Sequence, residues 1–560
     1  MPHDAFLKAI IADPDDDLPR LVYADSLDET GAADRAEFIR VQCQLANLEE
    51  HEHQVRELED REHALLAANE SKWFRSQRGL SEWVWRRGFV DDATDREIVT
   101  AEAEELFDTQ PISTWRTIYL RDRPRDLVLQ ELPDRCLAQV RHFDFSNSLW
   151  LPAEFDRRIA AIERPQFHSF DLSDILDPLP TLRAALQNHS GRALEKMELG
   201  NCLRVEFEPV IPQKPLLELL NRNPVAQLGL QGREVSTIDL AQLVSGRNAA
   251  VLRRLDISDN PIGPDGYRAF EQAHPSLRLQ SLDVSGTPLA GISLEPLLNT
   301  RALESLAKLE INGCGSARRN MNVLARSRFW TQATQLRAHS ATIPASTLEP
   351  LCQCDGPPAL RLLDLADNYL RAEGVRLLSE APWVDSLTWL ALTANYLDND
   401  ACAILAGSGR FRHLRTLHLA HNNIRQESGD GEQITDAGVL ALTESASLSN
   451  LRLLTLSQTG ITHRAVDSVL NGPHWRLSGL GIAGCNLGAQ TVQILAESPR
   501  LARLNWLDFS GNPLLGGDRL RPLAESPYLS PLCELDCGGL DIAPDVQAIF
   551  RERLGVRFGY

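Results

Sequence analysis

One short pattern recurs at a fixed interval in the middle of this chain of 560 residues. LRLLDLADNYL begins at Leu360, LTWLALTANYL at Leu387 and LRTLHLAHNNI at Leu414, so the spacing is 27 residues each time. Apolar residues at the first, fourth and sixth positions predict a short strand whose buried and exposed side chains alternate. A helix-like segment such as 372–381 then returns the chain to the next strand. Units this short must stack on one another to bury their apolar faces.

The same interval extends over most of the chain. Further starts lie at Trp115, Val140, Phe167, Leu194, Val225, Leu252, Leu279, Leu306, Ala333, Leu451, Leu477, Leu504 and Leu532. Together they predict about sixteen repeats over 114–543, with the weakest matches at Trp115, Phe167 and Leu532.

The eighth residue after each start marks where the chain should leave the strand. Asn368, Asn395 and Asn422 occupy this position, and we expect them to satisfy backbone groups there. A cysteine replaces the asparagine at Cys202, Cys314 and Cys485, which we expect to be buried core thiols.

The period, a helix in each unit and the recurring helix ends AESPRL (496–501) and AESPYL (524–529) resemble leucine-rich repeats of the ribonuclease-inhibitor type. The resemblance implies an α/β solenoid, a horseshoe with parallel strands on its concave side and helices on its convex side. Strands about 4.8 Å apart would give a concave row of about 75 Å. Members of this class bind ribonucleases, activate small GTPases or act as sensors, so the resemblance does not select one function.

Residues 1–70 do not follow this interval and predict a small all-α domain. One helix should end before Asp13-Pro14, a second at Gly31, and the apolar stripe from Phe38 onward should continue as helix through the charged segment 49–68. RLVYAD (20–25) and AEFIRVQ (36–42) resemble the repeat-companion domain at the N-termini of bacterial repeat proteins, although Ser26 replaces an expected Trp. That resemblance implies a companion module with no established activity.

Both ends of the repeat array should be capped. Residues 71–113 predict a linker and N-terminal cap, with a strand over 81–93 and a helix over 102–110. Residues 544–560 predict a C-terminal cap with a helix ending at Gly555 and a short last strand. We therefore expect a complete solenoid, because a bare end repeat would expose core.

Composition limits the partners and the location. The formal net charge of −20 disfavours binding to nucleic acid or to an anionic membrane, both of which need basic patches. No run of 18 apolar residues and no signal-peptide pattern is present, so we expect a cytoplasmic protein, with a monomer favoured.

Known catalytic and cofactor motifs are absent from the sequence. It contains no phosphate-binding glycine loop, no H-E-x-x-H and no G-x-S-x-G, so we expect no enzyme activity and no cofactor. Cys352 and Cys354 form a C-x-C without a second ligand pair, which disfavours a metal site. His339 and His418 would lie on the order of 14 Å apart, too far to act together.

The fifth position of each repeat should point from the strands into the concave groove, because buried residues flank it. It is acidic at Asp144, Asp171, Glu198, Asp256, Asp283, Glu310, Asp364, Asp508 and Asp536. His418 occupies the same position, and Trp389 and Trp506 lie at the third position of their repeats on the same face. We expect these twelve residues to bind a protein or peptide, with a basic partner favoured. The alternative is that Asp after Leu is simply a common choice in this repeat.

Two functions follow from this reading. The first is a non-enzymatic protein-interaction scaffold; the alternative is a regulator of an enzyme, similar to a GTPase activator or to ribonuclease inhibitor. One interruption bears on both, because the step from Leu414 to Leu451 is 37 residues. The surplus lies at 425–433, which predicts an exposed loop that is either a tolerated insertion or part of the binding surface.

Overall fold

The computed structural model divides into two compact units. Unit 1 comprises residues 1–235 and 246–255, and unit 2 comprises 236–245 and 256–560. The structure describes residues 3–48, 55–74, 80–95, 100–117, 133–146, 151, 153–162, 167–188, 194–200, 213–287, 294–314, 317–422, 433–555 and 558–559. Within these ranges no helix is both long enough and apolar enough to cross a bilayer.

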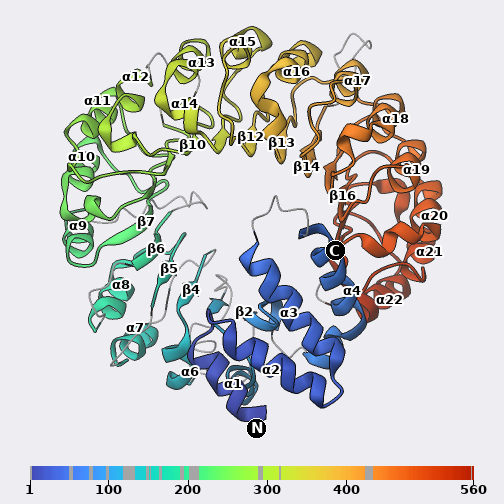
Figure 1. Ribbon diagram of the computed structural model, residues 1–560, viewed down its shortest axis with the longest axis horizontal. Coiled ribbons are helices and arrows are strands. Elements are labelled where there is room, and N and C mark those ends of the chain that lie inside the picture. The colour runs from blue at the N-terminus through green and yellow to red at the C-terminus, as the bar shows by residue number, and fades with distance from the viewer. Residues whose placement is uncertain are drawn as a thin grey trace. The chain divides into compact units, whose positions relative to one another are not determined.

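Unit 1 begins with helices and continues with strands separated by helices (Figure 1). Its helices are α1 (His3–Ala12), α2 (Leu18–Glu29), α3 (Ala33–Asn47), α4 (Val55–Trp73), α5 (Thr100–Thr109), α6 (Asp134–Gln139), α7 (Ala153–Ala160), α8 (Leu179–Leu186) and α9 (Gln213–Arg222). Its strands are β1 (Leu80–Arg86), β2 (Phe89–Asp95), β3 (Thr114–Thr117), β4 (His142–Asp144), β5 (Ser169–Asp171), β6 (Leu194–Glu198) and β7 (Val225–Gly229). Strand β8 (Arg254–Asp256) lies at the division between the units.

The N-terminal helices begin and end close to where the sequence predicts. Helix α1 ends at Ala12 before Asp13-Pro14, and Gly31 follows α2 with φ 83°. The expected continuous helix from Phe38 through 49–68 is wrong, because Leu48 is extended (φ −93°, ψ 145°) and separates α3 from α4.

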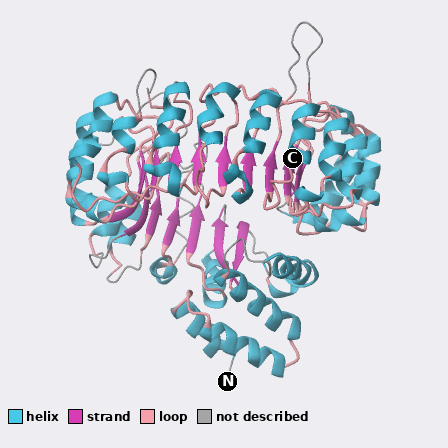
Figure 2. Cartoon of the chain, turned by 45° about the horizontal axis from the view of Figure 1, so that its top comes forward, coloured by secondary structure: helices cyan, strands magenta, loops and turns pink. Residues whose placement is uncertain are grey.

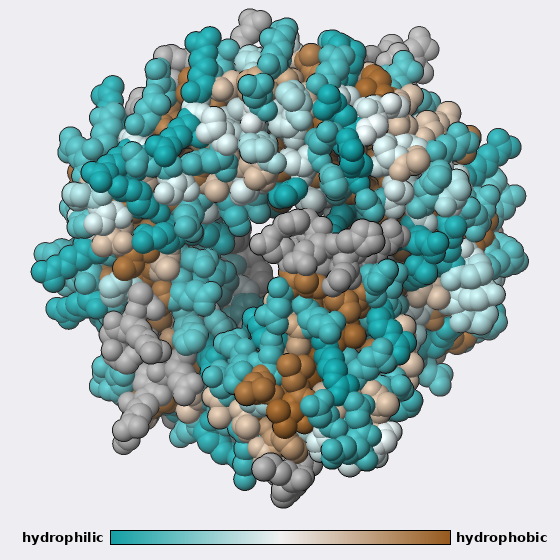
Figure 3. Space-filling model, viewed as in Figure 1, coloured by the Kyte–Doolittle hydropathy of each residue, from teal (hydrophilic) through white to brown (hydrophobic). Residues whose placement is uncertain are grey.

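Helix α2 divides the RLVYAD segment between core and surface. Arg20, Tyr23 and Ala24 are buried, whereas Leu21 is 37% exposed and Val22 45% exposed. Figure 3 shows hydrophobic residues gathered on the surface of the N-terminal helices. The segment that carries the family resemblance therefore presents an apolar outer face.

The expected single strand over 81–93 is a hairpin. Strands β1 and β2 pair antiparallel, with Arg86 opposite Phe89, and the turn at Arg87 and Gly88 has positive φ at both residues, as tight hairpin turns require. A Cβ at Gly88 would lie 2.5 Å from the Ile39 side chain, so only glycine permits this approach to α3. The hairpin turn thus docks the repeat array onto the helices.

Strands β2 to β7 of unit 1 form a parallel sheet in sequence order. Trp115 pairs with Phe143, the fourth residue of the repeat that starts at Val140. Trp115 is therefore a fourth-position residue and not a start, and Ile112 takes the first position. The first repeat begins three residues earlier than the pattern suggests.

Unit 2 contains the longer run of repeats. Its helices are α10 (Thr237–Ser245), α11 (Pro264–Arg268), α12 (Glu295–Leu298), α13 (Ala317–Arg326), α14 (Arg328–Gln332), α15 (Ala345–Gln353), α16 (Arg371–Glu380), α17 (Asn399–Gly407), α18 (Asp436–Glu444), α19 (His463–Asn471), α20 (Ala489–Glu497), α21 (Arg521–Ala524) and α22 (Pro544–Leu554). Its strands are β9 (Ser281–Asp283), β10 (Lys308–Glu310), β11 (Gln335–Arg337), β12 (Leu362–Asp364), β13 (Trp389–Ala391), β14 (Thr416–His418), β15 (Leu453–Thr455), β16 (Gly479–Gly481), β17 (Trp506–Asp508), β18 (Glu534–Asp536) and β19 (Phe558–Gly559).

These strands lie side by side and parallel, as Figure 2 shows. In Figure 1 they line the inner side of the curve of unit 2, with the helices outside. Paired, buried leucines run through the whole row: Leu282, Leu309, Leu336, Leu363, Leu390, Leu417, Leu454, Leu480, Leu507 and Leu535. This confirms the expected parallel solenoid with strands on one side and helices on the other.

Asparagines satisfy the backbone between repeats, as predicted. The Asn422 side chain donates to the Leu392 carbonyl (3.0 Å) and the Leu419 carbonyl (2.8 Å). Its Oδ1 accepts from the amides of Asn395 (2.8 Å) and Leu397 (3.0 Å). Each asparagine therefore joins its own repeat to the one before it.

The C-terminal end agrees with the sequence. Helix α22 ends at Leu554, Gly555 follows with φ 59°, and β19 pairs with β18. Cys202 and all but the last residue of the 425–433 insertion lie outside the described residues.

Candidate functional site

The side of the strands that faces away from the helices carries the residues predicted to bind a partner. In β9, β11 and β17 the middle leucine is buried and the residues on both sides of it are partly exposed. The third and fifth positions of a repeat therefore share one face, as the period of a strand requires. We call this surface the strand face.

Every aspartate predicted at the fifth position has a structural hydrogen bond. Each carboxylate accepts a hydrogen bond from the backbone N–H two residues later, and the turn closed by this bond ends the strand. The seven are Asp144, Asp171, Asp256, Asp283, Asp364, Asp508 and Asp536, with distances of 2.8–3.1 Å. Fold alone thus accounts for an aspartate at these positions, whatever binds there.

In unit 1 cationic side chains offset the acidic ones. Arg116, at the fifth position of the first repeat, lies 2.6 Å from Asp144 and 3.7 Å from Asp92. Burial alone would raise the pKa of Asp144, but hydrogen bonds from Ser146 and Arg116 lower it. Lys196 lies 3.4 Å from Glu198 on the same strand.

In unit 2 three acidic residues follow one another on adjacent strands. The Ile257 amide, which follows Asp256, donates to the Asp283 carbonyl (3.0 Å), and Asp283 pairs with Glu310. Burial raises the pKa of Asp283 to about 7, and repulsion from Asp256 and Glu310 adds to the rise. We call Asp256, Asp283 and Glu310 the acidic triplet. Lys308, the third residue of the repeat that starts at Leu306, is exposed on the same face, so the face is not uniformly acidic.

An arginine that the acidic pattern does not single out follows the triplet. Arg337 occupies the fifth position of the repeat that contains β11, 3.2 Å from Asp364 and 3.8 Å from Glu310. Its guanidinium lies 5.2 Å from the centre of the Trp389 ring, which also contacts His418 (5.1 Å between ring centres). Arg337 therefore connects the acidic and aromatic parts of the strand face.

Trp389, His418 and Trp506 are partly exposed on the strand face, as predicted. Burial lowers the pKa of His418, whose Nδ1 lies 3.1 Å from the Thr455 hydroxyl. Trp506 lies against β16, because a Cβ at Gly481 would come within 3.0 Å of its ring. The glycine therefore leaves the space that the indole occupies.

Two tyrosines belong to a neighbouring surface and were not predicted. Tyr369 is 50% exposed and stacks on Tyr396, with 5.4 Å between ring centres. Both follow the repeat's asparagine as N-Y-L in consecutive repeats, so their repetition in sequence could have revealed the pair.

The cysteines among the described residues are packing residues. Burial raises the pKa of Cys352 to about 12, and Cys354 accepts a hydrogen bond from the Trp330 indole (3.0 Å). Cys314 and Cys485 are buried at the asparagine position, as expected. A thiol held neutral in the core is a poor nucleophile.

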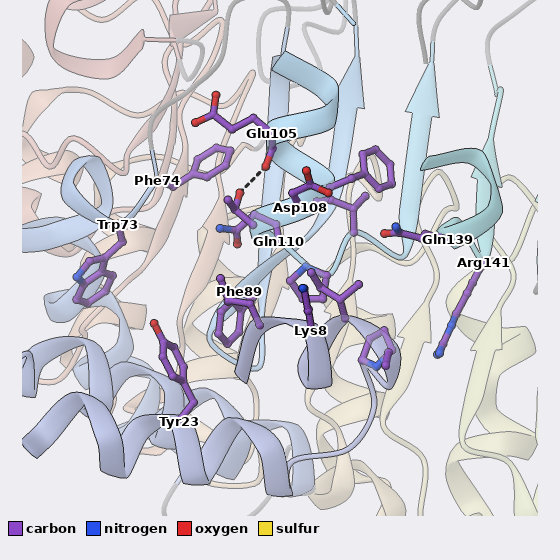
Figure 4. Close-up of a pocket in the computed structure, with 18 of the residues that line it drawn as sticks. Lys8, Tyr23, Trp73, Phe74, Phe89, Glu105, Asp108, Gln110, Gln139 and Arg141 are labelled. Atoms are coloured by element: carbon purple, nitrogen blue, oxygen red, sulfur yellow. Dashed lines mark hydrogen bonds between the residues drawn. The ribbon is translucent and has the colours of Figure 1, made fainter. Parts of the chain in front are cut away.

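A cavity of about 1070 Å³ in unit 1 forms a second concave site. Figure 4 shows Tyr23, Trp73 and Phe89 along one part of its wall and Gln139 and Arg141 at another. The cavity is lined from α1 to α6 and combines aromatic with charged side chains.

Arg35 lines this cavity and is a cation surrounded by aromatic rings. Its guanidinium lies 5.0 Å from the ring centres of Trp73 and Trp85 and 5.2 Å from that of Phe89. Within the described residues it has no carboxylate partner, its Nη1 is buried without a hydrogen bond, and burial lowers its pKa to about 10. Aromatic faces therefore take the place of an anion around this cation.

Known proteins match the repeats. The family described as "Leucine Rich repeat" matches residues 249–270 and 412–430. "Leucine-rich repeat-containing protein 14" of Homo sapiens is 35% identical over 121 residues, 21% of this chain and 24% of that protein. Ribonuclease inhibitor of Sus scrofa is 28% identical over 291 residues, 49% of this chain and 61% of that protein. An internalin from Listeria monocytogenes aligns at 18% identity with a TM-score of 0.36, over 60% of this chain and 80% of that one.

This chain thus covers about a quarter of the first relative and about three-fifths of the second. The activities and partners of these relatives belong to those proteins.

Proposed function

Since this chain is a leucine-rich repeat protein similar to ribonuclease inhibitor, we propose that it is a non-enzymatic scaffold that binds a protein or peptide on its strand face. The observation that carries the proposal is the run from the acidic triplet through Arg337 to Trp389 in unit 2. A partly exposed tryptophan beside charged groups is the composition of binding hot spots.

The preferred partner is basic. Asp283 lies between two other carboxylates, and a cation placed there would relieve their repulsion. Charge complementarity of this kind raises association rates and selects partners. Binding should therefore weaken as salt concentration rises.

Neutral substitutions provide the sharpest test. Partner proteins are first captured on the full chain, and their affinity is then measured for the triple variant Asp256→Asn, Asp283→Asn and Glu310→Gln. The asparagines keep the oxygen that accepts the turn hydrogen bond and remove only the charge. We expect at least about tenfold weaker binding, and about 30-fold for Trp389→Ala, the loss typical of a hot spot.

The matched control changes the same charge on the helices. Asp400, Glu444 and Asp467 are exposed on α17, α18 and α19, and their Asn, Gln and Asn variants should bind like the parent. Equal affinity of the parent, the triplet variant and Trp389→Ala would place the binding site elsewhere.

The similarity to ribonuclease inhibitor favours one alternative, a regulator of an enzyme. Inhibition of a ribonuclease by the purified chain would identify it as an inhibitor, and faster nucleotide hydrolysis by a small GTPase would identify it as an activator. Both activities would use the same face with a specific enzyme as the partner.

We propose a repeat-companion domain at 1–70 like those of bacterial repeat proteins, a linker and cap at 71–113, repeats over 114–543 and a cap at 544–560. We also propose a cytoplasmic monomer, and the net charge of −20 disfavours binding to nucleic acid or to an anionic membrane.

A further inference from the structure

Three side chains able to ligate a metal meet on unit 1. They are His142 in β4, His168 just before β5 and Glu195 in β6. Each contributes one ligand atom, and the three atoms all lie within 4.8 Å of one another. Both histidines are partly buried and the glutamate is exposed.

The stacking of the repeats brings these residues together. The His168 amide donates to the Arg141 carbonyl (2.7 Å), and the Glu195 amide donates to the His168 carbonyl (2.8 Å). Arg141, His168 and Glu195 are thus the second residues of three successive repeats, and His142 follows Arg141. No short sequence motif links them, which explains why the sequence predicts no metal ligands.

The two imidazoles are arranged for ligation. His142 Nδ1 lies 2.7 Å from the Ser169 hydroxyl, which orients the ring and leaves Nε2 available. The His142 and His168 rings are perpendicular, with 5.7 Å between their centres.

Glu195 supplies an anionic oxygen beside them. Within the described chain its carboxylate makes no hydrogen bond or ion pair. The nearby positive charge of Arg141 is offset by Asp15, 3.0 Å away. The carboxylate is therefore free to turn toward the imidazoles.

We propose that His142, His168 and Glu195 bind one Zn²⁺ ion, with water at the remaining position. Two histidines and a carboxylate with an open position form an established zinc ligand set. Zinc–ligand bonds of about 2.0–2.2 Å place ligand atoms about 3.3–3.6 Å apart, so modest rotation of the exposed Glu195 side chain closes the site. The ion would cross-link three consecutive repeats and stabilise unit 1 by mass action.

Metal binding is tested on the full chain with zinc alone. Isothermal titration of the metal-free protein with Zn²⁺ should show one site, and Mg²⁺, which prefers oxygen ligands, should not compete. We expect His168→Ala to weaken binding at least about 100-fold, and Glu195→Gln, which changes only an exposed side chain, at least about tenfold. Zinc should also raise the melting temperature of the parent but not of His168→Ala.

His339→Ala is the matched control, because His339 is an exposed histidine of unit 2. Its affinity for zinc should equal that of the parent. Substitution with Co²⁺ distinguishes this site from the cysteines, since thiolate ligands add strong near-ultraviolet absorption that nitrogen and oxygen ligands lack. No zinc binding, equal affinity in Glu195→Gln and the parent, or a thiolate spectrum would overturn the proposal.

Discussion

Substitution of Asn422 by leucine should weaken the solenoid locally and strongly. Leucine has nearly the same size but cannot replace the two hydrogen bonds that Oδ1 accepts from the amides of Asn395 and Leu397. Both residues are fully buried, so water cannot take over. An unsatisfied buried N–H costs about 1–3 kcal/mol, and two therefore cost about 2–6 kcal/mol. The lost donors to the Leu392 and Leu419 carbonyls add less, because a carbonyl has a second lone pair.

Cysteine at the same position is the matched comparison. This chain already uses Cys485 there, and its thiol donates to the Leu456 carbonyl (3.2 Å). Asn422→Cys should therefore destabilise less than Asn422→Leu. Each repeat contacts mainly its neighbours, so the loss should appear as local opening.

Hydrogen–deuterium exchange measures this opening directly. A loss of 2 kcal/mol corresponds to about 30-fold faster exchange, and we expect at least that for the amides of Asn395 and Leu397 in the leucine variant. Peptides from unit 1 should exchange as in the parent. Unchanged protection of 389–397, or a cysteine variant as labile as the leucine variant, would refute the proposed role of the asparagine.

Four further perturbations have defined outcomes. The pKa of Asp283 is raised to about 7 in the fold, so its contribution to the free energy of unfolding falls as pH rises from about 4 to about 7. In urea titrations Asp283→Asn should flatten this dependence and be more stable than the parent at pH 8. A parent that is equally stable at pH 5 and pH 8 would contradict this expectation. Gly481→Val should displace the Trp506 ring and cost about 1–3 kcal/mol, with a shifted tryptophan emission; an unchanged spectrum would argue against the packing. Arg35→Met should change stability by less than about 1.5 kcal/mol, because apolar residues replace buried ions well, whereas Arg35→Glu should melt far lower. Limited proteolysis should cut first within 425–433, and resistance of that segment would contradict the loop prediction.

The repeat register could be predicted because burial enforces it. Leu363, Leu390 and Leu417 follow each other at the predicted 27-residue step, and a slip of one residue would expose all of them. At the N-terminal end the pattern is weaker. The pattern places a repeat start at Trp115, whereas the pairing of Trp115 with Phe143 requires Ile112 at the start.

The hairpin was missed because its turn has no common sequence signal. The residues between β1 and β2 are Arg87 and Gly88, not Asn-Gly or Asp-Gly, and Arg87 adopts φ 52°, which few non-glycine residues do. Contacts with α3 select this turn, since Gly88 donates to the Gln42 side chain. Tertiary packing therefore determines this turn, which the alternation of apolar and polar residues over 81–93 does not predict.

Contacts across the strand face could be placed only in part. The sequence assigns Trp389 and Asp364 to the correct face, yet Arg337 reaches Trp389 from two repeats away. The metal-ligand group has the same origin, because His142, His168 and Glu195 meet only when three repeats stack. The spacing of residues along the sequence does not show which side chains contact each other across neighbouring strands.

The structural hydrogen bonds of the aspartates separate the two explanations for the acidic row. Since all seven accept from the amide two residues later, an aspartate at this position is by itself no sign of a binding site. What distinguishes one aspartate from another is its neighbours. Arg116 offsets Asp144 and Arg337 offsets Asp364, whereas Asp283 has carboxylates on both sides. An arrangement that raises the pKa of Asp283 opposes folding at neutral pH, so a bound cation would recover the most free energy there. The acidic triplet, and not the acidic row as a whole, is therefore where a basic partner should be sought.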